Sequence, residues 1–310
     1  MFRLSSKTPL SYKVKGWLQT PIQWSDRLQG KKWIDYAGAF EPQRWGRWDS
    51  QSCWAIAVVN SVEDQLEFLY KTGQFSEEAM HFFNSYGYLD AVGDFSLSER
   101  FIEILGKQKI QGGTSPMAWQ LMQKYGCIPR STLTYSIAKA DSFNIESDFV
   151  NDYFNPLAVT NEMRTIGQMF LTYVNIAYQT IGKNWYTPNR DILRAALQQA
   201  PVCIGLPTPV NVFNWNNEFV QYDGNKVPAH EVELHDIDET GQYKVSDQYN
   251  PSEKTLSRDY YICFATQGIV YSLSKPVAVI PLTEEQSYLQ KFWTSVNNFF
   301  NKIPNPFQIG

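Results

Sequence analysis

The stretch Ser50–Ala57 places a Cys-Trp pair at the start of a long apolar segment, and this feature constrains the fold of the chain most. From Cys53 to Tyr70 apolar residues recur at steps of three and four, which predicts a helix that Gly73 ends. Cys53 then lies in the first helical turn, where unpaired backbone N–H groups and the helix dipole favour a thiolate. The alternative is a core residue, since cysteine is among the most buried residue types.

The sequence Gln51–Ala55, followed by an apolar helix, resembles the nucleophile segment of papain-like cysteine peptidases. Further segments match that family in the same order along the chain, namely 73–78 and 112–135, and the stretch 110–129 is also similar to the bleomycin-hydrolase branch. The resemblance covers about residues 33–275. It implies an α+β, papain-like two-lobed fold, in which a helical lobe led by the nucleophile helix meets an antiparallel β-rich lobe.

The resemblance and the local patterns divide the chain into four parts. They are an N-terminal surface-wrapping segment (1–32), a helical lobe (33–199) with a helical insertion at about 138–186, a β-rich lobe (200–275), and a C-terminal amphipathic helix and tail (276–310). Apolar spacing predicts helices over Glu77–Phe83, Leu97–Leu105, Met117–Tyr125, most of 138–186 including Ile176 and Tyr178, and Asp191–Gln199, and a buried strand over Pro201–Leu206.

A histidine stands on a predicted hairpin in the second half of the chain. Residues 230–235 alternate between apolar and acidic side chains as a half-buried strand does, which places His230 on the apolar face and His235 on the polar face. After a turn at 238–241, a second strand is predicted over Tyr243–Asp247.

Folding this hairpin about residue 239 puts His230 opposite position 248, so Asp247 is expected within side-chain reach of His230. A carboxylate behind an imidazole fixes its tautomer and stabilises the imidazolium, as a general base requires. The alternative for His230 is a core histidine with satisfied hydrogen bonds. In the family an Asn stands where this chain has Asp247, and either side chain can accept the Nδ1 proton of the histidine.

The resemblance also implies a role for each site residue. Cys53 is the nucleophile, His230 shuttles the proton, and Asp247 orients His230. In the family a Gln before the nucleophile holds the oxyanion together with the backbone N–H of the cysteine. Gln43 is the best match, although it lies farther from Cys53 than the pattern expects and needs an inserted loop, since Arg47 occupies the expected spacing. A surface glutamine is the alternative.

A glycine pair, Gly112 and Gly113, precedes the predicted helix that begins at Met117. In the family such a pair lines the cleft and pairs its backbone with an extended substrate, and glycine suits this role because another backbone can approach it closely. The alternative is an ordinary turn, which glycine pairs commonly mark.

Charge and cysteine usage restrict the partners and cofactors. A net charge of −4 spread over both signs leaves no basic patch, so nucleic acid is not an expected partner. No apolar run reaches the length of a membrane span, and Met1–Lys7 lacks the apolar core of a secretory signal. The four cysteines, Cys53, Cys127, Cys203 and Cys263, form no CxxC pair, which favours free thiols and a reducing, cytoplasmic compartment or a particle assembled there. Neither a metal nor another cofactor is predicted.

The favoured function is a cysteine peptidase with a Cys-His-Asp triad, acting on a peptide or protein substrate. A transglutaminase-like acyltransferase is an alternative, because those enzymes also place Cys-Trp at a helix start with His and Asp on neighbouring strands. A papain-fold protein serving as a structural part of a larger assembly, such as a virus particle, is another. An apolar stripe on the predicted helix 283–303 is a candidate surface for a protein partner in that case.

Overall fold

The computed structural model describes residues 27–28, 30–38, 42–107, 112–181 and 188–273. The predicted C-terminal helix (283–303) lies outside the described residues, and so does most of the predicted N-terminal segment (1–32). Among the described residues, no helix combines the length and the apolar character needed to cross a membrane.

The described part contains α-helices, short 3-10 helices and strands. The α-helices are α1 (Cys53–Lys71), α2 (Glu77–Tyr86), α3 (Glu99–Gly106), α4 (Ser115–Tyr125), α5 (Ile137–Asp141), α6 (Glu146–Tyr153), α7 (Asn161–Tyr173) and α8 (Arg190–Leu197). The 3-10 helices are η1 (Trp33–Tyr36), η2 (Arg130–Leu133), η3 (Pro156–Ala158) and η4 (Val212–Asn216). The strands are β1 (Arg44–Trp45), β2 (Trp48–Asp49), β3 (Val174–Thr180), β4 (Val202–Leu206), β5 (Phe219–Val220), β6 (His230–Ile237), β7 (Tyr243–Ser246), β8 (Glu253–Leu256) and β9 (Phe264–Ser272).

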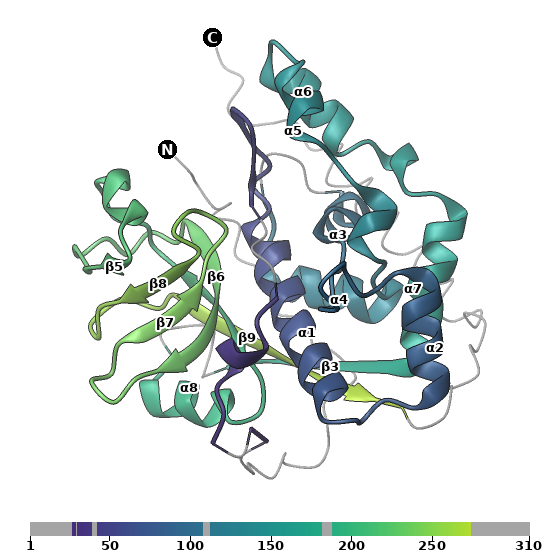
Figure 1. Cartoon of the computed structure of the whole chain (residues 1–310). Coiled ribbons are helices and arrows are strands. Elements are labelled where there is room, and N and C mark those ends of the chain that lie inside the picture. Colours follow the sequence, from purple (N-terminus) through teal and green to yellow (C-terminus); the bar gives the residue numbers. More distant parts are fainter. Residues whose placement is uncertain (1–26, 29, 39–41, 108–111, 182–187, 274–310) are drawn as a thin grey trace, which may run out of the picture. The chain divides into compact units, whose positions relative to one another are not determined.

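Helix α1 connects the helical part of the chain to the sheet. It contacts α3 and α4 on one side and β4, β6 and β9 on the other (Figure 1). The predicted helix is confirmed, because α1 begins at Cys53 and ends two residues before Gly73, which adopts a φ of +66°. Trp54, Ile56 and Leu66 are almost completely buried, and burying each such side chain stabilises the fold by about 1.5–3 kcal/mol.

The large sheet has seven strands in the order β3-β9-β4-β6-β7-β8-β5. All neighbouring pairs are antiparallel except β5 and β8, which are parallel. The prediction of an α+β fold, with a helical part led by α1 and an antiparallel β-rich part, is therefore confirmed.

Strand β6 is central in the sheet, and this corrects one prediction. His235 was expected on a polar, exposed face, but it is 7% exposed, and β6 is buried on both faces. The alternation of acidic and apolar residues that suggested a half-buried strand instead places Glu231 and Glu233 in the interior. Alternation alone therefore misjudged which face of this strand meets water.

The helical prediction for 138–186 is right in its first part and wrong over Val174–Thr180, while residues 182–186 lie outside the described residues. Helices α5, α6 and α7 occupy the first part, but Val174–Thr180 form strand β3. This strand pairs with β9 over its whole length, from Val174 opposite Ser272 to Thr180 opposite Thr266. Ile176 and Tyr178 continued an apolar spacing that fitted a helix, but the pairing with a strand far along the chain decides the local structure.

Candidate active site

The hairpin formed by β1 and β2 supplies the insertion that Gln43 requires to lie near Cys53. Arg44 pairs with Asp49 across this hairpin, which brings the residues on either side of it together. The backbone N–H of Ser50 donates to the Gln43 carbonyl at 3.2 Å, and the Ser50 hydroxyl donates to the same oxygen at 2.9 Å. Gln43 thus contacts a residue only three positions before Cys53, although ten positions separate Gln43 from Cys53 along the chain.

A second, small apolar cluster holds this hairpin in place. Trp45 of β1 packs against Tyr135 and Tyr153, with ring centroids 5.6 Å and 5.9 Å apart. On β2, the Trp48 ring stacks on Phe149 of α6, and its Nε1–H donates to a backbone carbonyl at the end of α5. The β1–β2 hairpin is therefore anchored on helices α5 and α6. The sequence analysis predicted these helices only as part of a separate insertion at about 138–186.

The backbone immediately before Cys53 adopts an uncommon conformation. Gln51 has a φ of +58°, in the left-handed region that costs a non-glycine residue about 1 kcal/mol or more. Its backbone N–H donates to Oδ1 of Asp49 at 2.9 Å, which stabilises this conformation. The turn leads directly into α1, so that Cys53 is the first residue of the helix and only 6% exposed.

His230 lies between the other two predicted site residues, Cys53 and Asp247. It is the first residue of β6, and its Nε2 lies 2.6 Å from Oδ1 of Asp247. Burial alone would lower the pKa of His230, but the charge and hydrogen bond of Asp247, followed by those of Cys53, raise it to about 10. Because Nε2 faces Asp247, Nδ1 is the nitrogen left for Cys53, so the expectation that Asp247 accepts the Nδ1 proton is wrong.

The register that predicted this contact was shifted by one residue. The hairpin pairs Leu234 with Val245 but Asp236 with Lys244, because a β-bulge lies between Leu234 and Asp236. The turn is centred on residue 240 and not on 239, which alone would shift the register by two positions, and the bulge reduces the shift on the His230 side to one. Asp247 follows the end of β7 and still reaches His230, so the predicted contact holds although the predicted register does not.

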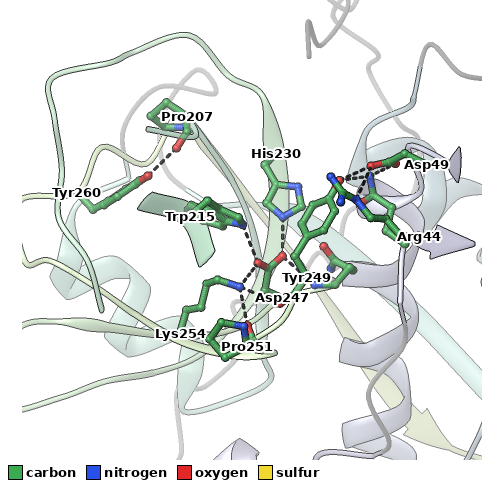
Figure 2. Close-up of polar contacts among 12 residues, drawn as sticks. Arg44, Asp49, Pro207, Trp215, His230, Asp247, Tyr249, Pro251, Lys254 and Tyr260 are labelled. Carbon is green, nitrogen blue, oxygen red and sulfur yellow. Dashed lines mark hydrogen bonds and ion pairs between the residues drawn. The ribbon is translucent and has the colours of Figure 1, made fainter. Parts of the chain in front are cut away.

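Asp247 is a buried carboxylate whose two oxygens are both occupied (Figure 2). Oδ1 accepts from His230 and from the backbone N–H of Gln248 at 2.7 Å. Oδ2 accepts from Nε1 of Trp215 at 2.7 Å and from Nζ of Lys254 at 2.6 Å. Burial alone would raise the pKa of Asp247, but the positive charges and hydrogen bonds of His230 and Lys254 lower it, which keeps the carboxylate ionised.

Tyr249 joins this group to the hairpin. Its ring lies 5.4 Å from the ring of His230, and Figure 2 shows it between His230 and Asp49. Its hydroxyl donates to Oδ2 of Asp49 at 2.6 Å, and the guanidinium of Arg44 lies over its ring at 5.3 Å. Burial and the charge of Asp49 raise the pKa of Tyr249, so the hydroxyl stays protonated and remains a donor.

The side chain of Gln43 faces the same two residues. Its Nε2 donates to Oδ1 of Asp49 at 2.6 Å and to the hydroxyl of Tyr249 at 2.9 Å. The amide is 2% exposed, and both of its N–H groups are used in these bonds. The structure therefore places Gln43 next to the residues around His230, with its donors directed at Asp49 and Tyr249.

The glycine pair lies beside the segment that carries Cys53. Gly112 has a φ of +69°, and a Cβ there would lie 3.6 Å from the backbone oxygen of Gln51. A Cβ on Gly113 would come within 2.6 Å of the indole ring of Trp54, closer than atoms can approach. Glycine is thus required at Gly113 by the packing of Trp54, a reason that the sequence alone did not suggest.

Three residues of the site were not predicted from the sequence, namely Trp215, Tyr249 and Lys254. The sequence contained a signal for Lys254. It lies two residues before Leu256 on a strand, so the two side chains point to the same, buried face of the sheet. A lysine on an apolar face needs an anionic partner, and Asp247 is near in sequence. Trp215 and Tyr249 lie on η4 and on an irregular loop, where no periodicity indicates a direction.

All four cysteines are free thiols, as predicted. Cys127 and Cys203 are fully buried, and Cys263 is 7% exposed, close to the 6% of Cys53. Burial raises the pKa of Cys263 to about 12. Among the described residues, no group of three or more His, Cys, Asp or Glu side chains could hold a metal ion.

Comparison with known proteins gives matches to solved structures. No family model matches the chain, and no curated protein matches it. Solved structures that resemble this chain include papain-like cysteine proteases. The bromelain protease from Ananas comosus, in complex with the E64 inhibitor, has a TM-score of 0.49 and 14% identity, over 78% of this chain and 97% of that one. The Amb a 11 cysteine protease of ragweed pollen, in its proform, has a TM-score of 0.49 and 16% identity, over 80% of this chain and 60% of that one. A Carica candamarcensis cysteine protease has a TM-score of 0.45 and 12% identity, over 79% of this chain and 98% of that one.

Proposed function

We propose that this chain is a cysteine peptidase that hydrolyses peptide bonds through a thioacyl-enzyme intermediate. The observation that carries the proposal is the 2.6 Å contact between Nε2 of His230 and Asp247, with Cys53 near enough to His230 to help raise the pKa of the imidazole. A thiol at the first residue of a helix, hydrogen-bonded to an imidazole that a carboxylate orients, is the arrangement that an activated sulfur nucleophile requires.

In the proposed reaction, Cys53 and His230 form a thiolate-imidazolium pair. The sulfur forms a C–S bond with the peptide carbonyl carbon, and the carbonyl π electrons move to the oxygen. When the oxyanion collapses, the C–N bond breaks and His230 gives its Nδ1 proton to the leaving amine. Neutral His230 then takes a proton from water as that water attacks the thioester, so the C–S bond breaks and the pair is restored.

The oxyanion needs hydrogen-bond donors that face the carbonyl oxygen. The backbone N–H of Cys53 is one, because the first N–H groups of a helix have no intrahelical acceptor. We assign the second to Gln43. To serve in this way, its amide exchanges the 2.9 Å bond to Tyr249 for a bond to the oxyanion and keeps its bond to Asp49.

We place the substrate backbone along Gly112. Its carbonyl and N–H lie close to the turn that precedes Cys53, as the short distance from its would-be Cβ to the Gln51 oxygen indicates. An extended peptide can pair its backbone with such a half-buried glycine segment. The next residue, Gly113, lies against the indole ring of Trp54, and this packing supports the segment.

The test is covalent labelling with E64, the epoxide inhibitor bound in the bromelain structure. Mass spectrometry after incubation is expected to find one adduct per chain, at Cys53. The adduct should be lost in Cys53→Ala and formed far more slowly in His230→Ala. Cys263 is an internal control, because its exposed fraction is nearly that of Cys53 while burial raises its pKa.

Labelling at Cys53 alone, dependent on His230, is the expected result, and cleavage of a peptide library would then define the substrate class. Absence of labelling in a folded sample contradicts the proposal. Equal labelling of Cys53 and Cys263 contradicts it as well, because reaction would then follow exposure of the thiol and not its activation by His230.

A further inference from the structure

Lys254 is a fully buried lysine at the edge of the proposed active site. Its side chain is 0% exposed, and lysine is almost never completely buried unless it is paired. Its ammonium group has three N–H donors, and the structure supplies three acceptors within 2.5–2.8 Å: Oδ2 of Asp247 and the backbone oxygens of Tyr249 and Pro251. Every donor of this buried cation is therefore used, and one of them is used on the partner of His230.

The surroundings of Asp247 are built around this pairing. Trp215 donates to the same Oδ2, its ring lies 5.5 Å from the ammonium group of Lys254, and it meets the ring of His230 edge-on at 5.4 Å. The two oxygens of Asp247 thus have separate tasks. Oδ1 faces His230, while Oδ2 is held by Lys254 and Trp215, which prevents the carboxylate from turning away from the imidazole.

We propose that Lys254 is a positioning residue of the peptidase. Its ammonium group offsets part of the charge of Asp247 and fixes the carboxylate, so that Asp247 holds the orientation of His230 as an amide partner would. The inference rests on the function proposed above and explains how an aspartate can stand where the resembling family has asparagine. In this proposal Lys254 acts through its positive charge, and not only through its hydrogen bonds to the carbonyls of Tyr249 and Pro251.

The charge is important because His230 must both hold and release a proton. A lone buried carboxylate beside the imidazole would stabilise the imidazolium so strongly that it became a poor acid for the leaving amine. The ammonium group of Lys254, bound to the same carboxylate, offsets part of that effect. The other titratable groups around His230 are Cys53, Tyr249 and, on its own strand, Glu231, and none of these supplies a positive charge.

A purely structural role is the competing explanation, because Lys254 also binds the carbonyls of Tyr249 and Pro251. Charge-matched variants separate the two. Lys254→Met removes the cation and leaves Asp247 ionised, whereas the double variant Asp247→Asn with Lys254→Met removes both charges and restores a neutral partner for His230. Lys244→Met is the control, since Lys244 is a lysine of the neighbouring strand bound to Thr255 and Asp238.

Two measurements apply to each variant. The first is the rate of E64 labelling at Cys53 as a function of pH. The second is the titration of His230 followed by NMR of 13C-labelled histidine, which needs no activity. The chain has three histidines, and the His230→Ala variant assigns the signal.

We expect Lys254→Met to label at least about 10-fold more slowly, because residues in one hydrogen-bond network couple strongly, and the double variant to return to within about 3-fold of wild type. The titration of His230 should move to higher pH in Lys254→Met and to lower pH in the double variant. Circular dichroism identifies any variant that fails to fold. If Lys254→Met fails to fold, the double variant still tests the inference, because it contains no unpaired buried charge.

An unchanged rate and an unchanged His230 titration in folded Lys254→Met would overturn the inference. A double variant that labels no faster than folded Lys254→Met would also overturn it, because the role of Lys254 would then be structural. Failure of the wild-type protein to label contradicts the proposed function instead. In that case the NMR titrations still decide whether Lys254 sets the charge next to His230.

Discussion

The hydroxyl of Tyr249 donates to the carboxylate of Asp49 at 2.6 Å, joining two residues that are 200 positions apart in the chain. Through this bond the hairpin before Cys53 is held to the loop after Asp247. Asp49 also accepts from the amide of Gln43 and from the backbone N–H of Gln51. One carboxylate therefore connects the turn before Cys53, the proposed oxyanion donor Gln43 and Tyr249, which packs on His230.

Replacing Asp49 by Ala should misplace all of these groups. Tyr249 and Gln43 would each lose a buried acceptor, which we expect to slow E64 labelling about 10-fold. Asp148→Ala removes an exposed carboxylate of α6 and is the matched control, with no change expected. A double-mutant cycle with Asp49→Asn and Tyr249→Phe should be non-additive. Additive effects would mean that the 2.6 Å bond does not couple the two segments.

Gln43→Leu should separate peptide hydrolysis from alkylation. If the amide stabilises the oxyanion, its loss lowers the kcat for a peptide substrate by about 100-fold and changes KM little. Opening of an epoxide by Cys53 forms no carbonyl oxyanion, so the E64 labelling rate should fall much less. Gln120→Leu, a change at an exposed glutamine of α4, is the control. Equal losses in the two assays would point to a structural role for Gln43.

The fold and the main site residues were predictable where the signal is local. The apolar period of α1 and the Cys-Trp pair at its start required only neighbouring residues. The contact between His230 and Asp247 was predicted from a single hairpin, and a turn centred on residue 240 in place of 239 shifted the register without abolishing that contact.

Features that depend on distant segments were not predictable. Strand β3 was taken for a helix because its partner, β9, lies almost 100 residues further along. The buried state of His235 follows from the central place of β6 in the sheet, which a single strand does not reveal. Lys254 is a different case, because Asp247 lies only seven residues away and the place of Lys254 on the buried face of β8 was a local signal.

Gly113→Ala should destabilise the protein through Trp54. The added methyl would lie 2.6 Å from the indole ring, and this ring is itself almost fully buried, so neither group can move freely. We expect a loss of about 1–3 kcal/mol in the free energy of unfolding, measured by urea titration. Gly38→Ala is the matched control, because its Cβ would meet only a backbone oxygen at an ordinary 3.6 Å. Similar stability of the two variants would contradict the packing of Trp54 on Gly113.

The stability of the fold should fall as the pH rises from about 4 to 8, because carboxyl groups are buried between α1 and the sheet. Burial, with a smaller contribution from the charge of Glu67, raises the pKa of Asp64 to about 8, although a hydrogen bond to Glu233 opposes the shift. Burial and the charge of Asp64 likewise raise the pKa of Glu233. Above an unfolded-state pKa near 4 the native state binds more protons than the unfolded chain, so each added pH unit favours unfolding until the native groups ionise.

Asp64→Asn tests this coupling directly. Its amide can still donate to Glu233 but cannot ionise, so the decrease in unfolding free energy between pH 5 and pH 8 should be smaller than in wild type by at least about 1 kcal/mol. Urea titrations at the two pH values measure the difference. Asp148→Asn, at an exposed position, should leave the wild-type pH dependence intact. If Asp64→Asn and wild type lose the same stability over this range, the buried carboxyl pair does not control it, and the dependence arises from other ionisable groups.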